Sequence, residues 1–302
     1  MSGFVLAIFG PTASGKSAVA EALADRVDAE LVSADAMQAY RGLPILTNQS
    51  ERPARLVGIW PLDHEGSVGE YQRLAHAAID EILTAGRVPV VTGGTGLYLR
   101  AALAELELPP APPARARARW ERLYDEEGAE RAHAALAARD PAAAGAVHAN
   151  DRRRVVRALE LAEAGASLRP ARDRLWTDET RHPTLVVGLD VPAAVLAERI
   201  EKRTRAMVAR GVVAETSAAL AGELSATARA TMGLEEFATL PTDDAVAEVV
   251  RKTRRYAAYQ RKWLRRLPGA VSVSADRPPD ATADAILEVA RARQRLPAGR
   301  AG

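Results

Sequence analysis

The first hundred residues alternate between short apolar runs and longer stretches in which apolar residues recur every three or four positions. The short runs are Phe4–Phe9, Glu30–Ser33 and Val88–Thr92, and their length is typical of strands. The periodic stretches, Lys16–Arg26 and Tyr71–Ala85, are typical of helices with one buried face. Strands that alternate with helices predict a parallel β-sheet flanked by helices, which is an α/β fold.

The pattern changes near residue 109. A proline-rich segment, Pro109–Pro113, interrupts it, and arginine-rich helical stretches follow as far as Gly165. The apolar run Thr184–Val191 then predicts a return to the sheet. We therefore expect residues 111–182 to form an inserted all-helical subdomain. Residues 1–110 and 183–302 are expected to form the α/β core.

The remaining third of the chain reads as more helices and one strand. Leu196, Ile200, Met207 and Val208 share one face of a long helix. A basic helix is predicted over residues 245–266, a strand over residues 270–273, and then a last helix with a frayed tail, RLPAGRAG.

The first strand runs directly into a glycine-rich loop and an alanine-rich helix. The loop reads GPTASGKS, which is the phosphate-loop pattern in its required context of strand, loop and helix. Its glycines let backbone N–H groups point at phosphate oxygens, and the helix N-terminus adds its dipole. We expect these residues to bind a di- or triphosphate, with Ser17 as a Mg²⁺ ligand: Gly10, Pro11, Thr12, Ala13, Ser14, Gly15, Lys16 and Ser17.

Two further residues with reactive or polar side chains follow predicted strands. Asp35 comes directly after the second strand, and Thr95 lies after the third among three glycines, which we expect to let a ligand approach the backbone closely. Because ligands bind beyond the carboxyl ends of parallel strands, we expect both to face the phosphate loop. Asp35 could hold magnesium or accept a proton from a nucleophile, and the alternative is that it caps the next helix.

Composition narrows the class of protein. The 302 residues carry a formal net charge of +2 and contain no cysteine, which excludes disulfides and thiolate metal sites. The five histidines show no i, i+4 pairing, so we expect no structural zinc. No basic lead-in precedes the first apolar run and glycine and proline interrupt it by residue 11, so neither a signal peptide nor a membrane span is predicted. We expect a cytoplasmic protein.

The positive charge is concentrated in two clusters. Residues 251–266 hold eight Lys or Arg and no acid, and Arg152–Arg154 form a second cluster with Arg157. Such clusters favour a polyanion footprint, although solvated helix faces remain an alternative. In the first cluster, Tyr256, Tyr259 and Trp263 are expected to form the packed face of the helix, leaving the arginines exposed. We expect three tryptophans to be buried anchors rather than base-stacking platforms: Trp120, Trp176 and Trp263.

Three segments together resemble a known family. GPTASGKS, DAMQAYR (residues 35–41) and GGTGLYLRA (residues 93–101) resemble, in order and spacing, the tRNA dimethylallyltransferases, also called tRNA isopentenyltransferases. Residues 150–165, 188–211 and 253–266 resemble further segments of that family, so the resemblance covers nearly the whole chain. The resemblance implies a P-loop NTPase-like parallel sheet flanked by helices. It also implies an enzyme that, with Mg²⁺, transfers the dimethylallyl group from dimethylallyl diphosphate to the anticodon stem-loop of a tRNA. The acceptor it implies is N6 of adenine 37, in tRNAs that read codons starting with U.

The resemblance also implies roles for individual residues. Lys16, Ser17 and Arg203 match diphosphate-binding positions, with Ser17 on Mg²⁺. Asp35 matches the general base for the adenine amine, and Thr95 matches a threonine that contacts the target nucleotide and the leaving end of the donor. We further expect a monomer that binds no membrane. The residues expected to contact tRNA are Asp35, Ala36, Met37, Gln38, Thr95, Arg117, Arg153, Arg154, Arg157 and Arg265.

Several positions depart from the family's usual pattern. Ala36 stands where serine is usual, Leu46–Ser50 replaces a GTAKP-like stretch, and Trp60–Leu62 replaces an HH-L-like element. Glu235 replaces a lysine, and Ala258-Tyr259 replaces two basic residues. The loss of cations from an RNA interface weakens its binding of phosphate groups. The donor half of the predicted site is therefore intact, whereas the acceptor half is altered.

Other functions remain open at this stage. The altered acceptor motifs favour a prenyltransferase that acts on free adenine nucleotides, although a mononucleotide needs neither the insert nor the arginine clusters. A P-loop small-molecule or nucleotide kinase would use the same loop for ATP, and Asp35 for Mg²⁺ or as a base. A non-catalytic RNA-binding relative is disfavoured because Lys16, Asp35 and Thr95 are intact.

Overall fold

The computed structural model describes residues 3–109, 114–168 and 174–293. Most of the predicted proline segment and the predicted C-terminal tail lie outside these residues. The chain divides into two compact units, one formed by Met1–Glu105 with Asp178–Gly302 and the other by Leu106–Thr177. The divisions fall a few residues before the sequence-based boundaries at 111 and 183. No helix of the described residues is long and apolar enough to cross a membrane.

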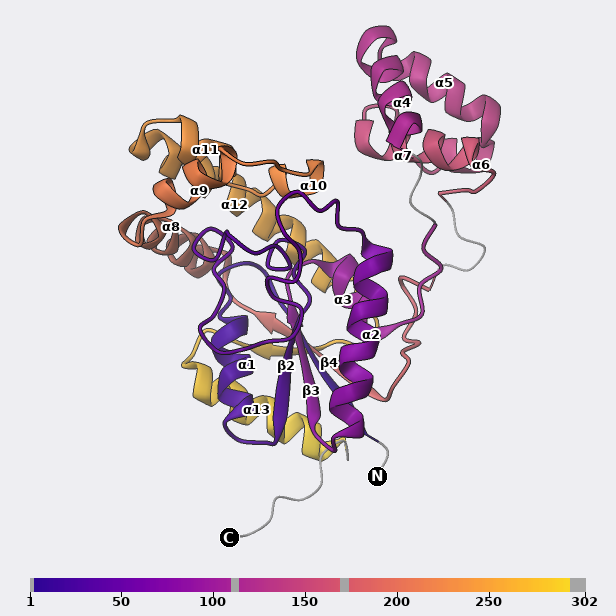
Figure 1. The fold of residues 1–302 in the computed structure, drawn as a ribbon. Coiled ribbons are helices and arrows are strands. Elements are labelled where there is room, and N and C mark those ends of the chain that lie inside the picture. The colour runs from indigo at the N-terminus through magenta and orange to yellow at the C-terminus, as the bar shows by residue number, and fades with distance from the viewer. Residues whose placement is uncertain (1–2, 110–113, 169–173, 294–302) are drawn as a thin grey trace. The chain divides into compact units, whose positions relative to one another are not determined.

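The first unit is built on a five-stranded sheet in which every pairing is parallel (Figure 1). The order of the strands is β2-β3-β1-β4-β5, so the strand that carries the phosphate loop lies at the centre. The predicted α/β fold is thereby confirmed. The strands are β1 Val5–Phe9, β2 Ala29–Ser33, β3 Val88–Gly93, β4 Thr184–Asp190 and β5 Val271–Ser274.

Helices cover both faces of this sheet. The connection from β1 to β2 and the connection from β2 back to β3 run in opposite directions along the sheet. Because crossovers between parallel strands are right-handed, their helices α1 and α2 must lie on opposite faces. In the structure α1 packs beside α13, and α2 packs beside α3. These helices are α1 Lys16–Ala24, α2 Val68–Thr84, α3 Gly96–Leu103 and α13 Pro279–Ala292.

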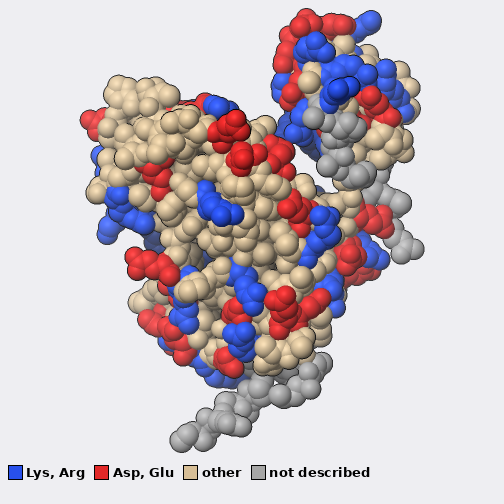
Figure 2. Space-filling model, in the orientation of Figure 1, with Lys and Arg blue, Asp and Glu red and all other residues tan. Residues whose placement is uncertain are grey.

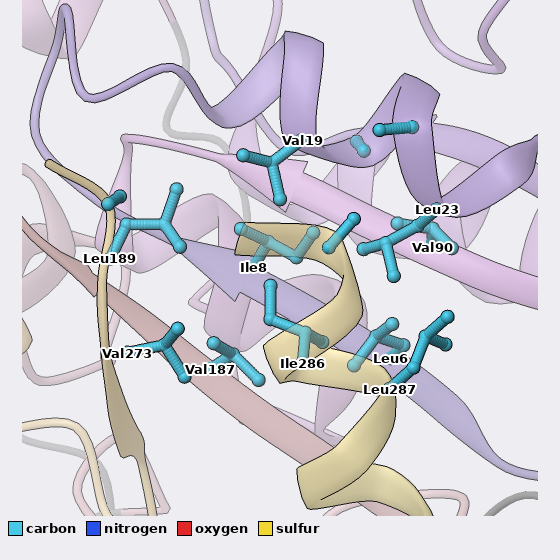
Figure 3. Close-up of a cluster of buried hydrophobic side chains, with 14 of the residues drawn as sticks. Leu6, Ile8, Val19, Leu23, Val90, Val187, Leu189, Val273, Ile286 and Leu287 are labelled. Atoms are coloured by element: carbon cyan, nitrogen blue, oxygen red, sulfur yellow. The ribbon is translucent and has the colours of Figure 1, made fainter. Parts of the chain in front are cut away.

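The core between the sheet and the α1/α13 layer is a continuous apolar cluster (Figure 3). Leu6 and Ile8 alternate along β1 toward this face, whereas Val19 and Leu23 of α1 meet them four residues apart. Ile286 continues the cluster from α13. Full burial of each such side chain contributes about 1.5–3 kcal/mol, so this cluster holds the phosphate loop on a rigid base.

Five further helices of the first unit follow β4. All of them except the third enclose a second apolar cluster, which also contains Leu43 and Leu46 from the long segment between β2 and α2. That segment is therefore anchored to helices far away in the sequence. The helices are α8 Ala193–Ala209, α9 Val212–Leu220, α10 Ala226–Arg229, α11 Leu234–Thr239 and α12 Thr242–Leu264.

The second unit is an all-helical bundle with its own core. Trp120 is only 6% exposed in that core, and its Nε1–H donates to a carboxylate oxygen of Glu163 at 2.7 Å. The guanidinium groups of Arg119 and Arg139 lie 4.7 and 4.9 Å from the centre of the Trp120 ring. Trp120 is therefore a packed anchor, as expected. The helices are α4 Ala114–Glu127, α5 Ala129–Arg139, α6 Pro141–Ala144 and α7 Arg152–Glu163.

Candidate functional site

The loops that carry the predicted chemistry leave the sheet at one edge. Phe9 of β1 pairs with Gly93 of β3, and Ser33 of β2 pairs with Thr92 of β3. The three strands therefore end at the same level. The phosphate loop, the segment that begins with Ala34-Asp35 and the glycine loop start side by side, which is the arrangement that places ligands beyond the carboxyl ends of parallel strands.

The phosphate loop has the curled backbone that anion binding requires. Gly15 adopts φ 87° and is the residue before the first turn of α1. Ala13 also has a positive φ, 64°, although it carries a Cβ. A left-handed conformation at such a residue costs of order 1 kcal/mol and is typical of ligand-binding segments. The Lys16 Nζ donates to the carbonyl of Pro11 at 2.8 Å, which holds its charge over the loop.

Two buried polar atoms, one in the loop and one beside it, have no hydrogen-bond partner among the described residues. They are the hydroxyl oxygen of Ser14 and the Nε of Arg203. Arg203 lies on α8, and its Nη2 donates to the hydroxyl of Thr12 at 2.6 Å. A buried donor without a partner costs about 1–3 kcal/mol, which a bound anion with free oxygens removes. The loop and α8 together therefore fit the oxygens of a diphosphate.

The charges around this loop act on one another. Burial lowers the pKa of Lys16, Asp35 partly opposes this effect and Arg203 adds to it, so that the pKa is about 8. Burial also lowers the pKa of Arg203, and Asp35 again opposes it. Two cations whose charged forms are costly are therefore gathered beside one carboxylate. A negatively charged ligand stabilises both cations.

We expect the affinity of the protein for an alkyl diphosphate to fall as the pH rises above about 8. The anion binds charged Lys16 more tightly than neutral Lys16, so affinity is fully present below this pKa and declines by up to about tenfold per pH unit above it. The ligand itself is fully ionised above about pH 7 and does not titrate there. Calorimetric titration from about pH 7 to about pH 10 measures the change. Lys16→Met should bind weakly at every pH, and a constant wild-type affinity would contradict the expectation.

Asp35 and Thr95 lie near a third polar side chain that the sequence did not single out. The Met37 N–H donates to Oδ1 of Asp35 at 3.0 Å, which fixes the carboxylate just after β2. Burial and Asp35 raise the pKa of the Tyr256 phenol to about 12, while hydrogen bonding with Thr95 and Gln260 opposes the rise. Tyr256 was expected only as an apolar packing residue, and nothing in its spacing indicated a polar role.

Gln260 joins the phosphate loop to the glycine loop. Its Oε1 accepts from the N–H of Thr12 at 2.7 Å, and its Nε2 donates to the carbonyl of Gly94 at 2.8 Å. The side chain comes from α12 and is only 2% exposed. One buried amide therefore sets the spacing between the two loops. Nothing in the sequence pattern indicated this role for Gln260.

The glycines of the 93–96 loop make room for the protein itself. The sequence-based interpretation was that they allow a ligand to approach closely. A Cβ on Gly94 would lie 2.3 Å from Nε2 of Gln260, and one on Gly96 would lie 2.1 Å from the Trp263 ring. A Cβ on Gly93 would lie 2.1 Å from a backbone oxygen after β2. That interpretation was wrong for these three positions, because the neighbouring protein atoms take the space.

Gln260→Ala should lower the free energy of unfolding by about 2–4 kcal/mol. It leaves the Thr12 N–H and the Gly94 carbonyl without partners and opens a cavity. Gln260→Glu should also be destabilising, because it keeps the acceptor for Thr12 but sets a carboxylate oxygen against the Gly94 carbonyl. Urea unfolding followed by circular dichroism measures both. Arg255→Ala, on an exposed part of the same helix, is the matched control and should change stability by no more than about 0.5 kcal/mol. Equal stability of Gln260→Ala and this control would contradict the role of Gln260.

The side chain of Gln38 is already engaged within the protein. Its Oε1 accepts from the hydroxyl of Ser33 at 2.9 Å, and its Nε2 donates to the carbonyls of Thr47 and Asn48 at 3.2 and 3.3 Å. Ala36 is buried, whereas Met37 is half-buried. The structure therefore brings Asp35 and its neighbours to the sheet edge, with Gln38 acting as a brace for the following segment.

The arginines expected to contact tRNA differ in their ion pairing and in their exposure. Arg117 and Arg157, in the second unit, both pair with Glu160, whose side chain is fully buried. Arg153 and Arg154 are exposed on the same unit, at the start of α7. In the first unit, Arg265 is exposed at the end of α12. Arg117 and Arg157 thus help to neutralise a buried carboxylate within the unit.

Comparison with known proteins identifies the family to which the chain belongs. The sequence profile described as IPP transferase matches residues 38–267, and that described as isopentenyl transferase matches residues 3–55. The chain belongs to the IPP transferase family. A tRNA dimethylallyltransferase of Salinispora arenicola is 43% identical over 280 residues, which cover 88% of this chain and 81% of that protein. One from Streptomyces avermitilis is 42% identical over 277 residues, with 87% and 88% covered. The crystal structure of a tRNA isopentenylpyrophosphate transferase from Bacillus halodurans matches with a TM-score of 0.69 at 29% identity, over 97% of both chains.

Two segments of this IPP transferase that depart from the usual family motifs pack within the protein. They are the segments around Trp60 and Leu46. Trp60 is 4% exposed, meets the Tyr40 ring edge-on at 5.6 Å and donates to Glu70 at 3.1 Å. The N–H groups of Ile45 and Leu46 both donate to the carboxylate of Glu215, at 2.9 and 2.8 Å. These residues brace the segment after β2 and do not present new chemistry.

The third departure lies in α12, where the exposure of Tyr259 contradicts the expectation from the sequence. Tyr259 was expected on the packed face together with Tyr256 and Trp263, but its exposed fraction is 54%. Gln260 takes the buried position beside it instead, at 2% exposure. Helical spacing placed Tyr259 three residues from Tyr256, and that spacing is also met by a residue at the edge of the packed face.

Proposed function

We propose that this protein transfers the dimethylallyl group from dimethylallyl diphosphate to N6 of adenine 37 in tRNAs that read codons starting with U. The observation that carries the proposal is the anion site of Lys16, Ser14 and Arg203 next to Asp35 and Thr95. Membership of the IPP transferase family and relatives described as tRNA dimethylallyltransferases support it. The best-supported function is therefore a tRNA-modifying prenyltransferase.

In the proposed reaction the carbon–oxygen bond between the allylic carbon and the diphosphate breaks, and the oxygen keeps the electron pair. The adenine N6 forms the new bond to that carbon and loses a proton to the carboxylate of Asp35. Lys16, Arg203 and the N–H groups of the loop stabilise the negative charge that grows on the leaving diphosphate. Thr95 contacts both the target nucleotide and the leaving end of the donor. The adenine must leave its stack to reach this site.

Mg²⁺ fits this site as a partner of the donor rather than as a resident ion. No group of three or more acidic or histidine side chains that could hold a metal occurs among the described residues. Mg²⁺ commonly keeps several waters and is bound by substrate phosphates with one or two protein oxygens. The half-buried hydroxyl of Ser17, at the first turn of α1, is the protein oxygen we propose. When bound there, Mg²⁺ would neutralise charge on the leaving diphosphate.

The proposed tRNA contacts use both units. In the second unit, Arg117, Arg153, Arg154 and Arg157 are proposed to meet the phosphates of the anticodon stem-loop. In the first unit, residues 35–38, Thr95 and Arg265 are proposed to hold the target nucleotide and its surroundings. We further propose that the protein acts as a monomer in the cytoplasm.

The decisive experiment offers radiolabelled dimethylallyl diphosphate with Mg²⁺ to unmodified tRNA and, in parallel, to AMP. We expect label on tRNA at the adenine beside the anticodon, and no label on AMP. Label on AMP alone would replace the proposed acceptor with a free nucleotide. A tRNA in which adenine 37 is changed to guanosine is the matched acceptor control. Phosphate transfer from ATP to a small molecule, without prenyl transfer, would instead indicate a kinase.

A further inference from the structure

Tyr259 has the highest exposure of the large hydrophobic side chains among the described residues. Its exposed fraction is 54%, compared with 42% for Leu240 and 38% for Leu74. It lies in the second half of α12, at a position where the family usually has a basic residue. A single exposed ring is ordinary on a protein surface, so its surroundings decide whether it has a role.

The ring of Tyr259 continues a line of aromatic surface that starts at the reactive groups. Its centroid lies 6.4 Å from that of Tyr256, with 24° between the ring planes. Tyr256 is half-buried, and its phenol is hydrogen-bonded with Thr95 and influenced by the charge of Asp35. An aromatic surface therefore leads from the proposed reaction centre to solvent. Aromatic faces of this kind are typical platforms for unpaired bases.

The cations closest to Tyr259 in the sequence form no ion pair with another described residue. In the first half of the cluster, Arg251, Lys252 and Arg254 each pair with a carboxylate. Within the described parts of the chain, no ion pair forms at four of the five remaining cations of the cluster, those other than Arg266. These cations are Arg255, Arg261, Lys262 and Arg265.

This arrangement differs from that of other surfaces of the first unit. On the face shown in Figure 2, Lys and Arg are interspersed with Asp and Glu over the region of α1 and α13. The helix dipole favours cations only in the last turn, so it does not account for Arg255. Arg255 and Lys262 lie four residues before and three residues after Tyr259, and helical spacing therefore puts all three on one side of α12. A ring flanked by unpaired cations is complementary to single-stranded nucleic acid.

We propose that Tyr259 stacks on an unpaired base of the tRNA anticodon loop that flanks the target adenine. This inference rests on the proposed function. A base-stacking contact then stands where the family usually has a cation, and it compensates part of the affinity lost with that charge. Stacking depends little on salt, whereas phosphate contacts depend strongly on it. The acceptor half of the site is therefore rebuilt with different chemistry.

The test compares three variants in binding an anticodon stem-loop RNA at several salt concentrations. Tyr259→Ala should weaken binding by about 5- to 150-fold, which is the range for losing one stacked base, with an unchanged salt slope. Tyr259→Phe should bind like the wild type because it keeps the ring. Lys262→Ala, the matched control on the same side, should weaken binding and reduce the salt slope by about one.

A direct readout of stacking is the fluorescence of 2-aminopurine placed, in separate RNAs, at each base flanking the target adenine. One of these RNAs should be quenched by the wild type and by Tyr259→Phe, but not by Tyr259→Ala. Because Tyr259 is exposed, all variants should keep wild-type binding of the diphosphate donor, which serves as the test of folding.

The proposal would be overturned by wild-type RNA affinity of Tyr259→Ala or by loss of affinity in Tyr259→Phe. A change of oligomeric state on Tyr259→Ala would also overturn it, because it would assign this face to a second copy of the chain. A wild type that prenylates tRNA while Tyr259→Ala keeps its KM for tRNA would overturn this inference alone. A wild type that neither binds nor prenylates tRNA would overturn both this inference and the proposed function.

Discussion

Asp35→Asn should reduce the rate of prenyl transfer by about 10²- to 10⁴-fold and leave donor binding unchanged or tighter. A positioned general base contributes about that factor, and asparagine cannot accept the proton of the adenine amine. Asparagine keeps the oxygen that accepts from the Met37 N–H, so the local turn is retained. Removing a negative charge near Lys16 and Arg203 also removes repulsion toward the diphosphate. Single-turnover kinetics with saturating donor and tRNA measure the rate, and calorimetry measures donor affinity.

The control for this prediction is Asp63→Asn, an exposed carboxylate in the segment between β2 and α2. It should transfer the prenyl group at the wild-type rate. Loss of donor binding in Asp35→Asn, together with a raised requirement for Mg²⁺, would make Asp35 a magnesium ligand instead of a base. A wild-type rate would remove Asp35 from the mechanism altogether.

Lys16→Met should reduce kcat/KM for the donor by about 10²- to 10³-fold. The loss of one charged donor aimed at developing negative charge in a partly dry site has that effect. Methionine preserves the length and much of the volume of the side chain, so the loop should keep its shape. Steady-state kinetics with varied donor measure the change. Lys202→Met, an exposed lysine on α8, is the matched control and should be neutral. Unchanged donor kinetics in Lys16→Met would contradict the proposed diphosphate site.

The same variant should raise the free energy of unfolding at neutral pH. Burial lowers the pKa of Lys16 from 10.5 to about 8, so the free folded protein holds a cation that is costly there. Between these two values the unfolded chain binds more protons, and wild-type stability therefore rises with pH in that window. The advantage of Lys16→Met is largest below pH 8 and shrinks toward pH 10.5. Urea unfolding at both ends of this range measures it. A Lys16→Met variant less stable than the wild type at neutral pH would contradict the cost assigned to Lys16.

Local patterns were sufficient for the sheet and for the donor site. The strand–loop–helix around Gly10–Ser17 is specified by consecutive residues, because the glycines, the lysine and the helix start must follow one another to curl around phosphate. Asp35 and Thr95 could be placed because parallel strands end at one edge of a sheet. Short apolar runs gave each strand to within one or two residues.

Contacts between distant parts of the chain could not be obtained in this way. Gln260 lies 248 residues from Thr12, and no spacing rule relates an amide on one helix to a loop so far away. The sequence pointed to Arg203 only through the resemblance, and its hydrogen bond to Thr12 appears only in the fold. The glycines of the 93–96 loop were assigned to ligand approach because α12 was not yet beside them.

The sequence by itself determined the α/β fold, the phosphate loop and the family, because each depends on residues close together in the chain or on motifs kept in order. Only the tertiary structure decided which side of α12 is buried. Gln260 and Tyr259 are neighbours, yet one is 2% exposed between two loops and the other is 54% exposed. A helix buries the side that finds partners, and those partners come from loops whose positions are set by the whole fold.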